Sequence, residues 1–145
     1  TVYNDSLLLG FKNPKIGNEA VILAISNFNE MLDSNKLDLG QVTIWRTLPL
    51  YDNTKGVFCG ISDLITYNDI IYGVSTGVSS RNGLDEDVGL YWRYSPQTDA
   101  LKIIQSFKDI KPEGISLTGE AGTFCIVFDN GVKNPSQFIF VKDSD

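Results

Sequence analysis

The sequence contains no histidine among its 145 residues. This absence excludes a Ser-His-Asp or Cys-His relay, and every histidine-ligated metal site, from the chain taken alone. Cysteine is scarce as well, and Cys59 and Cys125 both stand beside apolar residues. Two cysteines do not make a disulfide framework, so we expect two buried free thiols. A single disulfide is the alternative, and the redox compartment stays open.

Basic residues are few and scattered along the chain. There are 12 Lys and Arg residues against 18 Asp and Glu residues, which gives a formal charge of -6 and a pI of about 4.5. Nucleic-acid binding needs clustered positive charge, so we expect no nucleic-acid partner. An acidic surface instead favours cations wherever carboxylates converge.

Long hydrophobic runs are also missing. No run approaches the roughly 18 apolar residues of a membrane span, and no signal peptide is visible, so we expect no membrane span. The chain begins with Thr1 rather than Met, which leads us to expect a processed or dissected product. The missing signal therefore says nothing about the compartment, which stays unknown.

What the sequence does contain is a series of short apolar runs in a chain that is 42% hydrophobic, enough for a single core-forming region over residues 1–145. Runs of this length bounded by turn residues predict buried strands, although the run at 19–26 also suits a helix. The loops between them are expected at 27–39, 51–56 and 76–87. The predicted strands are 6–11, 19–26, 41–50, 60–67, 70–75, 88–95, 100–107, 112–115, 123–128 and 137–142.

The strands repeat. The turn, apolar run and glycine of Asn4–Gly10 align with Asn68–Gly73, and 123–128 is a third version. The offset from Asp63 to Glu113 is about fifty residues, within the range of four-stranded propeller blades. We therefore predict an all-β fold of antiparallel four-stranded propeller-type blades, with one full blade at about 60–107 flanked by two partial blades.

Three blades cannot close a ring, and each blade needs neighbours that bury its faces. The expected partners are therefore the remaining blades of a parent chain or other copies of this chain. A simple up-and-down sandwich or a small barrel is the structural alternative.

Several segments resemble, in the same order, motifs of an uncharacterised β-propeller-like family catalogued as domain of unknown function 3616. They are Leu8–Pro14 with the run 20–25, Gly60–Leu64, Gly89–Tyr94, Pro112–Ile115 and Asp129–Gly131. The resemblance implies the C-terminal part of a propeller related in style to phytase-like esterase and sugar-lactonase propellers. It implies no established activity.

Three carboxylates are the candidate site residues. Asp63 and Glu113 stand at matching points of two successive blades, where first strands line a central channel, and Asp129 follows a strand and could supply a third oxygen ligand. A ring of hard oxygen ligands suits Ca²⁺ or Mg²⁺, which could polarise a phosphoryl or carbonyl oxygen. The alternative is structural: Asp63 and Glu113 accept backbone N–H bonds, and Asp129 belongs to a glycine turn.

Two further features have simpler interpretations. The acidic loop at 82–87 could hold a surface cation but lacks the spacing of an EF-hand, which favours a solvated loop. Trp45-Arg46 and Trp92-Arg93 occupy comparable places, and packing between blades explains them better than substrate stacking.

The sequence thus predicts a ligand- or partner-binding scaffold. The alternative function is a metal-dependent esterase, lactonase or phosphatase-like hydrolase that uses the channel carboxylates. A third reading is an assembly piece whose open strand edges bind other chains.

Overall fold

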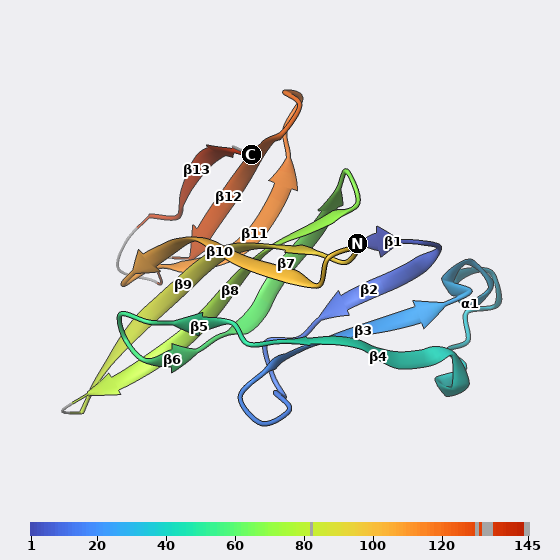
Figure 1. Ribbon diagram of the computed structural model, residues 1–145, viewed down its shortest axis with the longest axis horizontal. Helices are drawn as coiled ribbons and strands as arrows, with labels where there is room; N and C mark the ends of the chain where they lie inside the picture. The colour runs from blue at the N-terminus through green and yellow to red at the C-terminus, as the bar shows by residue number, and fades with distance from the viewer. Residues whose placement is uncertain (82, 130, 132–134, 144–145) are drawn as a thin grey trace.

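The computed structural model describes residues 1–81, 83–129, 131 and 135–143, and over these it is an all-β protein with one short α-helix (Figure 1). The strands form three larger antiparallel sheets and a small hairpin. We call the larger ones the first, middle and last sheets, after their order along the chain.

The first sheet has the strand order β1-β2-β3-β4, from Val2–Tyr3, Ser6–Gly10, Ala20–Ser26 and Val42–Leu48. Three of these strands match the predicted runs, and the run at 19–26 is a strand rather than a helix. The two-residue β1 was not predicted. A tight turn at Asn4 and Asp5 joins it to β2, and both residues have positive φ, 45° and 58°, as a two-residue hairpin turn requires.

The middle sheet has the order β10-β9-β8-β7, from Ala100–Lys108, Leu84–Ser95, Ile70–Arg81 and Gly60–Tyr67. Asn68 and Asp69 form the same kind of turn, with φ of 48° and 60°. The long loop predicted at 76–87 is wrong, because β8 and β9 stay paired as far as Arg81↔Leu84. Gly77 there does not break the strand: a Cβ on it would lie 2.7 Å from Val57, so glycine admits the neighbouring hairpin.

The last sheet contains β11 (Lys111–Leu117), β12 (Thr123–Asp129) and β13 (Gln137–Lys142). The loop expected at 51–56 contains the start of a hairpin of β5 (Tyr51–Asp52) and β6 (Val57–Phe58). The segment expected as a connecting loop at 27–39 holds α1 (Phe28–Ser34), followed by the 3₁₀ turn η1 (Leu39–Gln41).

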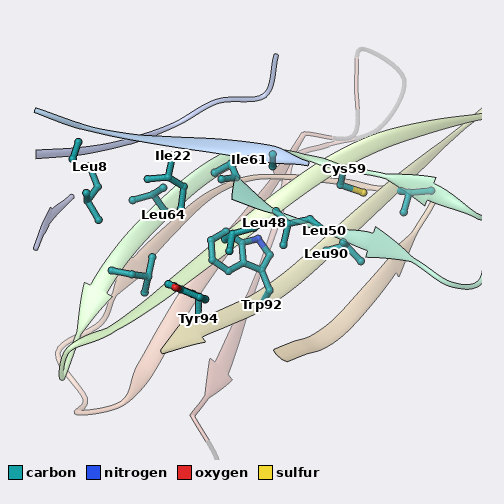
Figure 2. Close-up of a cluster of buried hydrophobic side chains, with 14 residues drawn as sticks. Leu8, Ile22, Leu48, Leu50, Cys59, Ile61, Leu64, Leu90, Trp92 and Tyr94 are labelled. Carbon is teal, nitrogen blue, oxygen red and sulfur yellow. The ribbon is translucent and has the colours of Figure 1, made fainter. Parts of the chain in front are cut away.

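The three sheets pack face to face in succession, with the middle sheet between the other two (Figure 1). Alternation along β8 and β9 sends Ile71 and Trp92 toward the first sheet and Tyr72 and Tyr91 toward the last one. Figure 2 shows the first apolar layer, in which Trp92 lies among residues of both sheets. The central parts of β8 and β9 are therefore buried on both faces, whereas the edge strand β10 is largely exposed.

The first and middle sheets share a β-bulge at the same place. In the first sheet an extra residue, Trp45, interrupts the pairing of β4 with β3, and in the middle sheet Ile104 interrupts the pairing of β10 with β9. The two pairs that flank these bulges, Leu23↔Ile44 and Trp92↔Ile103, thus occupy corresponding positions. This register allows the faces of the sheets to be compared residue by residue.

Candidate functional site

Asp63 lies in β7 and fastens the middle sheet to the last one. Its carboxylate oxygen Oδ1 accepts the backbone N–H of Leu64 at 2.8 Å, and Oδ2 accepts that of Ile115 in β11 at 3.0 Å. Both oxygens of the carboxylate thus bind backbone donors of two different sheets. The structural alternative considered for this residue, acceptance of backbone N–H groups, is what the structure has.

Asp63 and Glu113 do not stand at matching points, so that part of the sequence interpretation is wrong by one residue. The extra residue of the bulge is Ser62 in β7 and Glu113 in β11. Asp63 therefore corresponds to Gly114, where a side chain is missing. A Cβ on Gly114 would lie 2.9 Å from Cγ2 of Val127 but 3.8 Å from Oδ2 of Asp63, an ordinary contact, so the absent side chain makes room for Val127.

Glu113 forms an ion pair instead of accepting backbone N–H groups. Its two carboxylate oxygens lie 2.8 and 3.1 Å from Nζ of Lys12, which follows β2. Because both side chains are partly exposed, the pair adds only modestly to stability. It does bring the segment between β2 and β3 against the start of the last sheet.

This ion pair borders a pocket of about 380 Å³ to which all three sheets contribute. Lys12, Asn13 and Lys15 come from the segment after β2, and Lys111 and Glu113 from β11. Strand β8 and the end of β12 complete the lining. The pocket is lined by Lys12, Asn13, Lys15, Thr76, Gly77, Val78, Lys111, Glu113 and Asp129.

Three of the chain's 12 basic residues converge on this pocket. Two of them bind carboxylates, because Lys12 pairs with Glu113 and Lys111 with Asp87 at 3.2 Å. Lys15 instead donates to the carbonyl oxygen of Phe58 at 2.6 Å, a contact that does not neutralise its charge. The lining thus carries three ammonium groups and two carboxylates, in a protein whose formal charge is -6.

Asp129 also lines the pocket, at the end of β12. Its Oδ1 accepts the N–H of Gly131 at 2.8 Å, and Gly131 has a φ of 68°, so the glycine turn considered for this residue is present. Asn130, the middle residue of the predicted turn, lies outside the described residues. Of the three predicted carboxylates, Glu113 and Asp129 thus line one pocket, and Asp63 is not part of its lining.

Within the described part of the chain, no group of three or more Cys, Asp or Glu side chains is placed to hold a metal ion. The Ca²⁺ or Mg²⁺ site of Asp63, Glu113 and Asp129 stays a prediction. The predicted acidic loop is part of β9 from Leu84 onward, and Asn82 lies outside the described residues. Its acids have protein partners: Asp85 accepts from Ser80, Glu86 pairs with Lys55, and Asp87 with Lys111.

The two Trp-Arg dipeptides serve packing, as predicted. Trp92 is fully buried between sheets and donates to Oγ of Ser75 at 2.8 Å. Trp45 packs edge-on against Tyr94 with ring centroids 5.9 Å apart, and Nε of Arg46 donates to the Tyr94 hydroxyl at 2.7 Å. The contacts of Trp45 and Arg46 with Tyr94 join the first and middle sheets.

Both cysteines are free thiols, as expected, but only Cys59 is fully buried, whereas Cys125 is half-buried. Burial raises the pKa of the Cys59 thiol to about 12, with a lowering contribution from Lys15 and a raising one from Asp52. Cys59 is thus a protonated core residue, not a nucleophile.

Sequence reasoning missed the lysines of the pocket. Lys12 and Lys15 flank the turn residues Asn13 and Pro14, and Lys111 lies far away in the chain, so no local spacing connects them.

Comparison with known proteins reveals no relative of this chain: no family model, no curated protein and no solved structure matches it. No described helix has the length and apolar character needed to cross a membrane.

Proposed function

We propose that the chain is a β-propeller-type scaffold that binds a small anionic ligand, carrying a phosphate or carboxylate group, in the pocket between its three sheets. The observation that carries the proposal is the convergence of Lys12, Lys15 and Lys111 from two distant segments of an acidic protein. Ammonium groups are strong donors to phosphate and carboxylate oxygens.

Three features support the propeller-type architecture. The sheets are antiparallel and stack face to face in chain order, and the middle one has four strands in simple succession. The first and middle sheets share the Asn-Asp turn and a bulge at the same place, and β7 and β11 share another bulge. Successive four-stranded units of this kind are typical of propeller blades.

The location of the pocket supports ligand binding. It lies where the segment after β2 meets the start of β11, so each of the three sheets supplies polar groups to one cavity. A volume of about 380 Å³ is within the range of small-molecule sites. The ion pair of Lys12 with Glu113 can exchange partners, because both side chains are partly exposed.

Amide NMR titrations with inorganic phosphate and with citrate, at constant ionic strength, test this proposal. We expect shifts of the amides of 12–13, 15, 76–78, 111 and 113, and binding weakened at least about tenfold in Lys15→Gln. Lys36→Gln, which changes an exposed lysine away from the pocket, is the matched control. Shifts spread over other lysines, or equal affinities of the two variants, would contradict an anion site.

A third titration, with Ca²⁺ and Mg²⁺, addresses the predicted metal site. Glu113 and Asp129 line the same pocket, so a cation there would compete with Lys12 for the Glu113 carboxylate. Cation binding that is lost in Glu113→Gln, together with no phosphate binding, would replace the anion proposal by the metal site. We expect phosphate binding, and no cation binding that depends on Glu113.

A further inference from the structure

The last sheet presents an apolar outer face to solvent. Val127 of β12 is 46% exposed, and its neighbour across the strands, Phe138 of β13, is 62% exposed. Phe140 is also exposed, and Cys125 opposite it is half-buried. We call Cys125, Val127, Phe138 and Phe140 the rear face of the last sheet.

The same positions are covered in the middle sheet. Counting from the shared bulge of β7 and β11, Val127↔Phe138 corresponds to the pair Val74↔Tyr91. Val74 and Tyr91 are 0% and 2% exposed, because the last sheet packs on them. The last sheet thus carries apolar residues at positions that are buried in the middle sheet, but no further sheet of the described chain packs on them.

The first sheet has the opposite uncovered face. Its pair Leu23↔Ile44 corresponds to Trp92↔Ile103 of the middle sheet, where Trp92 is 0% exposed beneath the first sheet. Ile44, in contrast, is 57% exposed. The front face of the first sheet is an apolar groove of about 190 Å³ lined by Phe11, Pro14, Ile16, Val21, Leu23 and Ile44.

The two uncovered faces are the two halves of one kind of interface. Inside the molecule, the rear face of one sheet always packs on the front face of the next: Leu8 and Ile22 on Ile71, and Tyr72 on Phe124. What is left over is a front face on the first sheet and a rear face on the last sheet. A second copy supplies both complements at once, because each face carries apolar side chains.

We propose that the rear face of the last sheet docks on the front face of the first sheet of a second copy of this chain. If both ends of two copies meet in this way, the pair closes into a ring of six sheets, within the usual range of four to eight propeller blades. The inference rests on the propeller-type architecture proposed above and not on the anion pocket.

Sedimentation equilibrium of the full chain tests the proposal. We expect the wild type, with a chain mass of 16.0 kDa, to form a concentration-dependent dimer. Because every interface contains one rear and one front face, Phe138→Glu and Ile44→Glu should each raise the dimer dissociation constant at least about tenfold. Leu39→Glu replaces an apolar residue that is also exposed but lies outside both faces, and should leave the constant unchanged.

Mixing the two variants gives the sharper result. The rear face is intact in Ile44→Glu and the front face in Phe138→Glu, so one complete interface can form between them. We expect the mixture to dimerise at concentrations at which each variant alone is largely monomeric. Dimerisation that only one substitution weakens would indicate a face docked on its own kind and would overturn the proposal.

Alkylation of Cys125 provides a second readout, because this thiol belongs to the rear face whereas Cys59 is fully buried. We expect slower labelling of Cys125 as the wild-type concentration rises, and no such dependence in Phe138→Glu. A wild type that is monomeric up to its highest attainable concentration would also overturn the proposal. In that case the two faces would be left for sheets outside this chain. Phosphate binding by the monomer would show that the anion-binding pocket does not depend on dimerisation.

Discussion

At the scale of single residues, the clearest feature is a carboxylate that works as a structural acceptor. Asp63 binds the N–H groups of Leu64 and Ile115, which occupy corresponding positions of two sheets. A neutral amide could accept through one oxygen alone, and its NH₂ group would face a backbone donor. The two hydrogen bonds therefore require aspartate rather than asparagine, its closest isostere.

We expect Asp63→Asn to lower the free energy of unfolding by about 1–3 kcal/mol, the range for losing a hydrogen bond to a charged group. Urea denaturation measures this change. Asp69→Asn is the matched control, because Asp69 is exposed in a turn with φ of 60°, where Asn is equally at home. Equal urea midpoints for the two variants would show that the hydrogen bonds of Asp63 do not stabilise the packing of the two sheets.

The misplacement of this residue in the sequence interpretation has a physical cause at the same scale. Asp63 and Glu113 align well as letters, but a bulge adds Ser62 to one strand and Glu113 to the other. A one-residue change of register moves a side chain to the other face of a sheet. The apolar pattern of the two strands did not reveal these bulges, so the partner of each carboxylate was not predicted.

At the scale of elements, most strands were predictable because their ends are marked. Asn4-Asp5 and Asn68-Asp69 both form the turns that their residue types favour, and the runs after them are strands. The extended part of β8 and β9 was missed because glycine and serine there resemble a loop. Strand β6, which no local pattern places there, lies against Gly77 in that stretch.

The next prediction concerns Gly73, another glycine of β8. A Cβ on Gly73 would lie 2.1 Å from Cζ2 of Trp92, whose ring is fully buried between the first and middle sheets. Neither strand can shift without opening the layer around Trp92, so Gly73→Ala should lower the free energy of unfolding by at least about 2 kcal/mol.

Gly119→Ala is the control for this change, since nothing lies within 4 Å of a Cβ there and its φ is not positive. We expect it to shift the urea midpoint little or to raise it slightly. A small effect of Gly73→Ala would mean that the first apolar layer is looser than the packing of Trp92 implies.

At the scale of the whole molecule, the pocket is a product of the stacking order. Lys12, Lys15 and Lys111 meet because the segment between β2 and β3 and the start of β11 both lie beside β8, and 99 positions separate Lys12 from Lys111 in the sequence. An overall charge of -6 even points away from such a cluster. The all-β class follows from local patterns, whereas this site exists only in the assembled stack.

The final prediction concerns the apolar layer between the middle and last sheets, which contains Tyr72 and Tyr91. Burial raises the pKa of Tyr91 to about 12, and burial also raises the pKa of Tyr72 beside it. A raised tyrosine pKa means that the unfolded chain releases the proton first. Stability from these groups is therefore complete below about pH 10 and is lost as the pH rises toward 12.

Tyr91→Phe isolates the contribution of one phenol to this loss. The Tyr91 hydroxyl is buried and has no hydrogen-bond partner among the described residues, so the variant should match the wild type at neutral pH or exceed it slightly. At about pH 11 we expect it to retain about 1 kcal/mol more than the wild type, relative to neutral pH, because that is the linkage of one such shift. Urea midpoints measured at both pH values test this, and an identical pH dependence of the two proteins would refute the assignment of the alkaline loss to this layer.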